Sequence, residues 1–586
     1  KKFRFHGSLI LVIVTVLTAC GRPTESEKLK NLFEREWDSR LEDSPLYASW
    51  VGVKDYDDRL PDMTLENLQR QADESRTFLD ELSRLDLGKL SREEQISAQI
   101  FRKQLEESIR SFEFGEYRVP MNSDSGFHTS IAFLPQRLSP QTVKDYDNYI
   151  SRLRQIPRYF TEQTALMRLG LEQGMTLSRV VVTGIPGGIE AHVVEDVSDS
   201  VFCGPVKRFP GSIPADQQDR IRREVEEAIR DSVVPAYQAL ADFMLNEYMP
   251  DTRDSLGASE LPEGLEYYGW LIRQHTTLDL SPDQVHQIGL DEVARIKSAM
   301  LEIIDSVGFE GGFDAFLVFL RTDPQFYAQT PDELLQKASY IAKRMDGKLP
   351  VLFKTLPRQP YTVQPVPEDL APNYTSGRYV SAPPASTLPG IYWVNTHNLS
   401  SRPLYALPAL TLHEAVPGHH LENALSQELT GIPNFRRFSG INAYGEGWGL
   451  YSEFLGIETG IYTTPYEDFG RLTYEMWRAC RLVVDTGIHA MGWTRQQAID
   501  YLASNTALSI HECTTETDRY ISWPGQALAY KLGELKIREL RKRAEEMLGP
   551  AFDLRAFHDA ILLNGPVPLT LLEDQIDRWI SETQAR

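Results

Sequence analysis

The sequence predicts a mainly helical protein with a small β element. Long stretches carry apolar residues at spacings of three and four, the period of a helix with one buried face. Prolines gather in one region, 349–401, where they exclude long helices. The chain shows no convincing repeat and no low-complexity linker. We therefore expect residues 21–586 to form one large helical domain, or two lobes, 29–348 and 349–586, that share a cleft.

The first twenty residues indicate targeting rather than fold. Basic residues precede an apolar run, 9–17, and Leu17-Thr18-Ala19-Cys20-Gly21 matches the lipobox of bacterial lipoproteins. The run is short for a membrane span. We expect residues 1–20 to act as a lipoprotein signal peptide, with Cys20 acylated. Gly21 after the cysteine favours the outer membrane, facing the periplasm.

Composition indicates a folded, water-exposed chain behind that anchor. Hydrophobic residues make up 41% and charged residues 25%, and no second long apolar run occurs. The formal net charge of −22 argues against nucleic acid or an anionic membrane surface as a partner. We expect membrane contact through the N-terminal lipid only. The remaining cysteines, Cys203, Cys480 and Cys513, are too few for a disulfide framework, although Cys480 and Cys513 could pair.

Several segments have the helical period over twenty residues or more. A break is expected at Ser44-Pro45, and Ser281-Pro282-Asp283-Gln284 has the features of a helix N-terminus with a capping box. The expected long helices cover 64–85, 92–110, 140–171, 215–246, 281–307, 466–504 and 524–548.

The proline-rich region predicts short strands instead. Arg378-Tyr379-Val380 and Gly390-Ile391-Tyr392-Trp393-Val394-Asn395 are rich in aromatic and β-branched residues. These two segments lie directly upstream of the most informative motif in the chain. They form either a small structural hairpin or part of a substrate cleft.

That motif is His413-Glu414-Ala415-Val416-Pro417-Gly418-His419-His420, which indicates a metal site with its own base. Two neutral imidazoles and a carboxylate suit Zn²⁺ and leave one position open for water, from which Glu414 is free to take a proton. In the usual pattern the histidines stand four residues apart. Here the fourth position is Pro417, so we expect Pro417 and Gly418 to kink the helix and return His419 to the metal. His419 is the preferred second ligand and His420 the second choice.

A second helix should supply the third ligand of a single zinc ion per chain. Glu446 lies between Gly445 and Gly447, which leave room for a metal, and is our preferred ligand. Glu453 lies two helical turns further on, nearly on the same face. It is the alternative ligand, or a partner that orients a ligand histidine.

These motifs resemble the bacterial lipoprotein family called domain of unknown function 885, whose signatures are His-Glu-x-x-Pro-Gly-His-His and Glu-Gly-Trp. The resemblance covers nearly all of the mature chain. It implies a distant similarity to the gluzincin zinc peptidases, the group of thimet oligopeptidase and angiotensin-converting enzyme, and therefore a large helical fold with a central cleft. Glu446-Gly447-Trp448 is also similar to a ligand motif of zinc aminopeptidases. Further matching stretches are 276–277, 286–290, 390–395, 485–489 and 524–531.

The resemblance suggests further roles near the metal. In gluzincins a strand edge pairs with the extended substrate, and Asn395 or the backbone around Val394 could serve that purpose. Tyr530, in the last matching stretch, is our choice for the phenol that polarises the scissile carbonyl.

Other polar groups could act on the substrate. Asp485 and His489 stand four apart on one helical face, so the carboxylate could orient an imidazole that stabilises the oxyanion or reaches substrate. Arg519 and Lys531 could receive a peptide carboxylate.

We therefore expect a zinc-dependent peptidase that hydrolyses short peptides in the cell envelope, with Glu414 activating the water. The ligand types also suit Mn²⁺ and Co²⁺. One alternative is a metal-dependent amidase or deacylase acting on another small amide. A second is a non-catalytic binding lipoprotein, against which Glu414 argues, because it has no packing reason to stand beside His413. The sequence does not fix the oligomeric state.

Overall fold

The computed structural model describes residues 23–368, 370–384 and 387–585, so the predicted signal peptide and Cys20 lie outside the described residues. Helices dominate, and one small three-stranded sheet accompanies them, which confirms the mainly α prediction. Within the described part of the chain, no helix is both long and apolar enough to cross a bilayer. Cys203, Cys480 and Cys513 are buried free thiols.

The described part of the first half of the chain contains helices and no strand. Its helices are α1 (Glu25–Asp43), α2 (Pro45–Val51), α3 (Leu65–Ser83), α4 (Arg92–Phe114), α5 (Phe127–Ala132), α6 (Leu134–Arg137), α7 (Val143–Gln173), α8 (Arg179–Val182), α9 (Ile185–Glu190), α10 (Gly204–Lys207), α11 (Ala215–Ala228), α12 (Val234–Phe243) and α13 (Met249–Asp251). Two π-helical turns, Ile229–Val233 and Met244–Tyr248, join α11, α12 and α13 end to end, so the helix expected over 215–246 continues to Asp251.

The second half carries the sheet and the remaining helices. These are α14 (Gly264–Thr276), α15 (Pro282–Ser306), α16 (Gly312–Thr322), α17 (Pro331–Asp346), α18 (Leu349–Leu352), α19 (Leu407–Glu414), α20 (His419–Glu428), α21 (Asn434–Arg437), α22 (Asn442–Thr459), α23 (Pro465–Met491), α24 (Arg495–Asn505), α25 (Ile510–Ser522), α26 (Ala529–Leu548), α27 (Leu554–Leu562) and α28 (Leu569–Gln584). The run expected over 466–504 is split between α23 and α24, because Gly492 ends α23 in the left-handed conformation.

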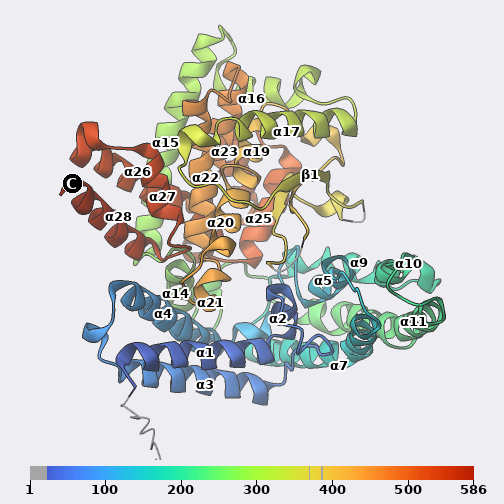
Figure 1. Ribbon diagram of the computed structural model, residues 1–586. Coiled ribbons are helices and arrows are strands. Elements are labelled where there is room, and N and C mark those ends of the chain that lie inside the picture. Colours follow the sequence, from blue (N-terminus) through green and yellow to red (C-terminus); the bar gives the residue numbers. More distant parts are fainter. Residues whose placement is uncertain (1–22, 369, 385–386, 586) are drawn as a thin grey trace, which may run out of the picture.

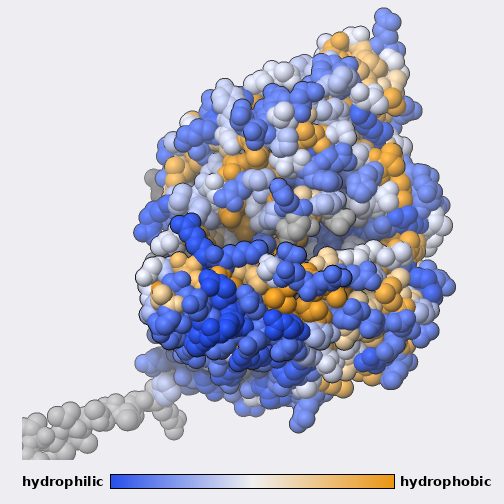
Figure 2. Space-filling model, turned by 90° about the vertical axis from the view of Figure 1, so that its right-hand side faces the viewer, coloured by the Kyte–Doolittle hydropathy of each residue, from blue (hydrophilic) through white to orange (hydrophobic). Residues whose placement is uncertain are grey.

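The chain divides earlier than the lobes suggested by the sequence. In Figure 1, α1–α13 form the lower part and the later helices the upper part. Helix α15 packs along α23, and α17 packs against α19, so residues 282–346 belong with the C-terminal half rather than with 29–348. Figure 2 shows one face of the molecule. This face is mostly hydrophilic, and a group of hydrophobic residues lies near its middle.

Specific contacts join the two parts. The buried guanidinium of Arg436 in α21 pairs with Glu93 in α4. At another point, the Ser123 N–H donates to the Ser522 hydroxyl at the end of α25, over 3.0 Å.

The sheet lies directly upstream of α19. Its strands are β1 (Tyr361–Pro365), β2 (Gly377–Val380) and β3 (Gly390–Val394), in the order β1-β3-β2; β1 is parallel and β2 antiparallel to β3. Strand β1 was not predicted, because it is bounded by Pro360 and contains Pro365. Proline is tolerated at a sheet edge, where no partner strand needs its missing N–H.

This topology corrects the strand role expected for Val394 and Asn395. Val394 belongs to the central strand, so its backbone is not a free edge. Asn395 is fully buried, and its side chain donates hydrogen bonds to the carbonyls of Ala371, Tyr374 and Thr375. The strand with an open edge toward the helices of the motif is β2.

Helices α22 and α26 approach each other closely through glycines. A methyl group at Gly533 would lie 2.0 Å from the Ala443 carbonyl oxygen, and one at Gly447 would lie 2.5 Å from the Gly533 backbone. Because Gly447 follows Glu446 directly, this contact fixes the position of the carboxylate.

We predict that Gly533→Ala lowers the free energy of unfolding by at least about 2 kcal/mol, because the added methyl group has no space. The matched control is Gly269→Ala in α14, where no atom lies within 4 Å of the added carbon. This control should stabilise the protein by about 0.5–1 kcal/mol through helix propensity. Chemical denaturation measures both, and equal effects would contradict the tight crossing.

Candidate metal centre

The helix of the motif breaks between its histidines. Helix α19 ends at Glu414 and α20 begins at His419. The Val416–Pro417 peptide bond is cis, and the Gly418 N–H donates to the Leu412 carbonyl over 2.9 Å. A methyl group at Gly418 would lie 1.9 Å from the His413 carbonyl oxygen, so only glycine fits this turn. The kink expected from Pro417 and Gly418 is present.

The break brings His413 and His419 to one carboxylate. Glu446 Oε2 lies 3.5 Å from Nε2 of His413 and 3.3 Å from Nε2 of His419. The ligand atoms of the three residues all lie within 4.8 Å of one another, and no other such group of three or more occurs among the described residues.

These separations fit a zinc ion. Ligand atoms about 2.0–2.1 Å from a tetrahedral zinc lie about 3.3–3.4 Å from one another. The distances from Glu446 Oε2 to the two histidine nitrogens, 3.3 and 3.5 Å, match that value. Two imidazoles and one carboxylate are also the donor set of catalytic zinc, with a fourth position left for water.

The structure separates the alternatives that the sequence left open. His420 turns away from the cluster: its Nδ1 lies 3.1 Å from the Tyr379 hydroxyl and its Nε2 lies 3.0 Å from the Gln359 carbonyl. Glu453 is not in the triangle of possible ligands. Its Oε1 lies 2.8 Å from Nδ1 of His413, which makes it the residue that orients this imidazole.

Two neighbours of Glu446 hold the histidines in place, a role that the sequence analysis did not assign. The Trp448 indole N–H donates to the Pro417 carbonyl over 2.8 Å and so fixes the turn between His413 and His419. Gly449 makes room for the His413 ring, because a methyl group there would lie 2.8 Å from it. The motif Glu-Gly-Trp-Gly therefore has a structural explanation beyond its carboxylate.

Glu414 is held beside the cluster by the edge of the sheet. Its Oε2 accepts a hydrogen bond of 2.7 Å from the Tyr379 N–H of β2. This bond uses the open edge of β2, and Oε1 makes no hydrogen bond to any other described residue. The carboxylate that the motif predicts as base therefore has one oxygen fixed.

Tyr530 lies beside the ring of His413. The two rings are stacked with centroids 6.4 Å apart. The Arg519 guanidinium donates to the Tyr530 hydroxyl over 3.3 Å, and the guanidinium carbon of Arg481 lies 4.3 Å from the ring centroid. Positive charge therefore surrounds the phenol that the sequence analysis placed at the site.

His489 does not lie where the sequence prediction placed it. It is fully buried: Nδ1 accepts from the Ala258 N–H over 2.9 Å, and Nε2 lies 2.9 Å from the Tyr520 carbonyl. Asp485 accepts from the Tyr268 hydroxyl instead of orienting His489. Both ring nitrogens of His489 are occupied by the backbone, so its role is structural.

Lys531 is likewise unable to receive a substrate. Its ammonium is fully buried and pairs with Glu292, Glu475 and Glu534, at 3.0, 2.9 and 2.7 Å. The residue joins α15, α23 and α26 rather than facing the cleft.

The cluster attracts positive charge. Burial opposes a proton on His413, but Glu446 and Glu453 outweigh it and raise the pKa of His413 to about 10. Burial also opposes ionisation of Glu446, yet His419 and His413 hold the pKa of Glu446 well below its usual range. A fourth carboxylate, Glu422, lies behind His419, and burial raises the pKa of Glu422 to about 7.

Comparisons with known proteins agree with this fold. A family model described as a bacterial protein of unknown function, DUF885, matches residues 45–576. A solved structure from Colwellia psychrerythraea, described as a "putative lipoprotein", is 31% identical with a TM-score of 0.90, and the match covers 95% of this chain and 100% of that chain. A "putative lipoprotein of unknown function" from Shewanella oneidensis is 17% identical with a TM-score of 0.70, over 94% of this chain and 99% of that chain; at this identity the likeness shows the fold alone. A comparison with curated proteins finds no match.

We predict that Glu453→Gln lowers zinc affinity by about 10- to 100-fold, because the amide orients the His413 imidazole less strongly than the carboxylate does. Competition with a chelating dye measures the affinity. Glu458→Gln is the matched control, since Glu458 lies on the same helix but is exposed and pairs with Arg541. Equal affinities in the two variants would contradict the orienting role of Glu453.

Zinc binding should also release protons. In the metal-free protein the pKa of His413 is about 10, so this imidazole carries a proton at neutral pH, whereas zinc requires it neutral. Apparent zinc affinity should therefore rise about tenfold per pH unit between roughly pH 7 and 9. Calorimetry in buffers of different ionisation enthalpy counts the protons released.

The same shift affects the stability of the metal-free protein. Because the folded pKa of His413 is raised from 6.5 to about 10, its contribution is fully present below pH 6.5 and is lost as the pH rises through about 10. Zinc binding without proton release would contradict a protonated His413.

Proposed function

The chain belongs to the family of bacterial proteins of unknown function DUF885, as its motifs suggested, and we propose that it is a zinc-dependent peptidase that hydrolyses short peptides in the cell envelope. One observation carries the proposal. A buried imidazole, a half-buried imidazole and a carboxylate stand at zinc-ligand separations, with Glu414 held beside them by the sheet edge.

His413, His419 and Glu446 would hold the zinc, and Glu453 would orient His413. A zinc ion there would lower the pKa of a water molecule and polarise a substrate carbonyl. Glu414 accepts the proton of the attacking water on Oε1, because Oε2 is bound to the Tyr379 N–H, and later passes it to the leaving amine.

Tyr530 supports the same chemistry from across the cluster. Its hydroxyl lies next to the Arg519 guanidinium, so a negative charge that develops on the carbonyl oxygen meets a phenol and a cation. The open edge of β2 would align an extended peptide beside Glu414 by main-chain hydrogen bonds. An edge strand, a base and a phenol around one metal site favour amide hydrolysis of a peptide over a purely binding role.

The likeness to the gluzincin peptidases is part of this proposal, because it rests on the donor set and on the mainly helical fold. So is the location: an acylated Cys20 would anchor the enzyme to the outer membrane, facing the periplasm. The solved structure from Colwellia psychrerythraea, described as a "putative lipoprotein", supports a lipid anchor.

We predict that Glu414→Gln reduces peptide turnover at least about 100-fold, since a general base contributes 10²- to 10⁴-fold. Zinc content, measured by plasma mass spectrometry on protein purified without added metal, should stay near one per chain. His413→Ala should instead lose the metal. Full turnover by zinc-loaded Glu414→Gln would exclude Glu414 as the base, and a wild-type protein that takes up no zinc would overturn the proposal.

A further inference from the structure

A second cationic side chain stands near Arg519, on the strand that fixes Glu414. Arg378 directly precedes Tyr379 in β2, and neighbouring side chains of a strand point to opposite faces. Tyr379 faces His420 in α20, whereas the guanidinium carbon of Arg378 lies 5.3 Å from the Tyr374 ring centroid. Arg378 is therefore on the face of the strand away from His420.

Arg378 is accessible to solvent and has no ion pair among the described residues. Protein atoms around the guanidinium partly desolvate it and oppose its charge, and Arg519 opposes it too. Tyr374 and Asp124 favour the charge, and the balance raises the pKa of Arg378. Both arginines adjoin residues of the metal centre: Arg378 precedes Tyr379, whose N–H binds Glu414, and Arg519 donates to Tyr530, which stacks on His413. Tyr530 favours the charge of both.

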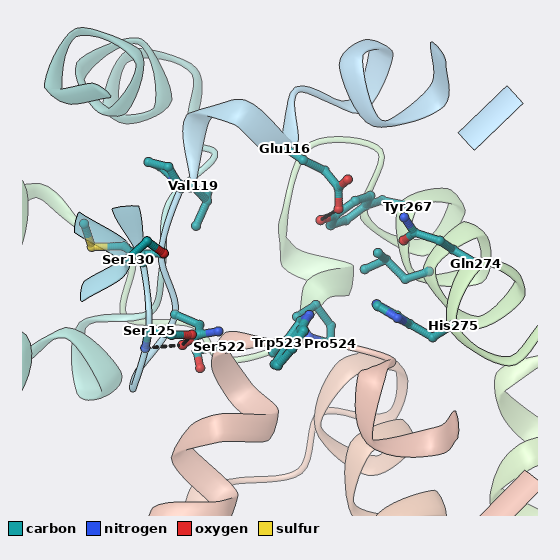
Figure 3. Close-up of a pocket in the computed structure, with 15 residues that line it drawn as sticks. Glu116, Val119, Ser125, Ser130, Tyr267, Gln274, His275, Ser522, Trp523 and Pro524 are labelled. Atoms are coloured by element: carbon teal, nitrogen blue, oxygen red, sulfur yellow. Dashed lines mark hydrogen bonds between the residues drawn. The ribbon is translucent and has the colours of Figure 1, made fainter. Parts of the chain in front are cut away.

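Arg519 contacts Trp523, which lines a cavity between the two parts of the chain. The cavity has a volume of about 470 Å³ and is lined by residues that include Glu116, Tyr267, His275 and Trp523. Figure 3 shows Trp523 and His275 on one side of it, and Val119 and Ser130 of the N-terminal part on the other.

Two contacts connect this cavity with the metal centre. The Arg519 guanidinium carbon lies 5.7 Å from the Trp523 ring centroid, and the same group donates to Tyr530. Nδ1 of His275 lies 2.8 Å from the Asn442 amide, and Asn442 begins α22, about one turn before Glu446. The cavity thus lies one side chain beyond the residues of the site.

Positive charge predominates around Arg378 and Arg519. The acidic group of the N-terminal part that acts on both arginines is Asp124, on the loop between the cavity residues Asn122 and Ser125. Asp124 forms no ion pair with either guanidinium in the described part of the chain. Arg519 forms an ion pair of 3.5 Å with Glu516, whereas the Arg378 guanidinium remains available to a ligand.

We propose that Arg378 and Arg519 form a carboxylate-binding subsite beside the metal centre, so that the enzyme selects peptides with a negative group close to the scissile bond. Guanidinium groups bind carboxylates through paired, charge-assisted hydrogen bonds. The neighbouring cavity, of a size that suits small ligands, receives the side chain next to that carboxylate. This inference rests on the proposed peptidase function and adds a substrate class to it.

The test compares matched short peptides that end in a free carboxylate or in an amide. Wild-type enzyme should show a kcat/KM about 30-fold higher for the acid than for the amide, the size of a lost charge-assisted contact. In Arg378→Gln the ratio should fall to near one, mainly through the acid. Arg84→Gln, which changes an exposed arginine directly after α3, is the control and should keep the wild-type ratio. A wild-type ratio near one, or equal losses for acid and amide in Arg378→Gln, would overturn the subsite.

A third peptide distinguishes the source of the negative charge. An amidated peptide with an aspartate at its last position restores the high kcat/KM if an acidic side chain is bound, and behaves like the plain amide if the terminal carboxylate is required. Either outcome supports the subsite, provided that Arg378→Gln removes the preference.

A binding measurement separates this proposal from the peptidase proposal. Calorimetry with zinc-loaded Glu414→Gln and the same peptides needs no turnover. Tighter binding of the acid that depends on Arg378, without hydrolysis by wild type, would uphold the subsite and reject the peptidase. Hydrolysis by wild type without any preference for the acid would uphold the peptidase and reject the subsite.

Discussion

The contact of Glu446 with His413 and His419 is the constraint on which the rest of the structure depends. Glu414, Glu453 and Glu422 also lie around these imidazoles, so the cluster requires a positive charge, supplied by protons or by a metal ion. Such a site is stable only if each group is fixed. The glycine turn at Gly418, the Trp448 hydrogen bond to Pro417 and the close approach of α22 to α26 all serve that end.

The parts of the site that were predictable from sequence are those with local causes. Pro417 and Gly418 kink the chain wherever they occur in a helix, so the return of His419 toward His413 followed from the motif itself. The choice between His419 and His420 depended on what surrounds the turn, because Gln359 and Tyr379 occupy His420. The spacing of residues in the sequence shows which side chains share a helical face, but not which part of the protein packs against that face. This is why His489, on a fully buried face, was misassigned to the site.

Long-range packing accounts for the other differences. The Lys531 ammonium is surrounded by glutamates from three separate helices, which no local pattern could reveal. The division of the chain follows the packing of α15 along α23, two helices far apart in sequence. The helix periods themselves were sufficient for the mainly α fold. Strand β1 was missed because its two prolines resemble those of a loop.

The glycine contact between α22 and α26 has a consequence for how the protein can evolve. Since Gly447 and Gly533 leave no space for a side chain, substitutions on these faces would displace Glu446, and the chemistry is confined to one geometry. Substitutions disturb Glu446 less at surfaces outside this contact, such as β2 and the loop 122–125 of the N-terminal part. Members of the family could therefore diverge in the ligands that they bind while His413, His419 and Glu446 keep their arrangement.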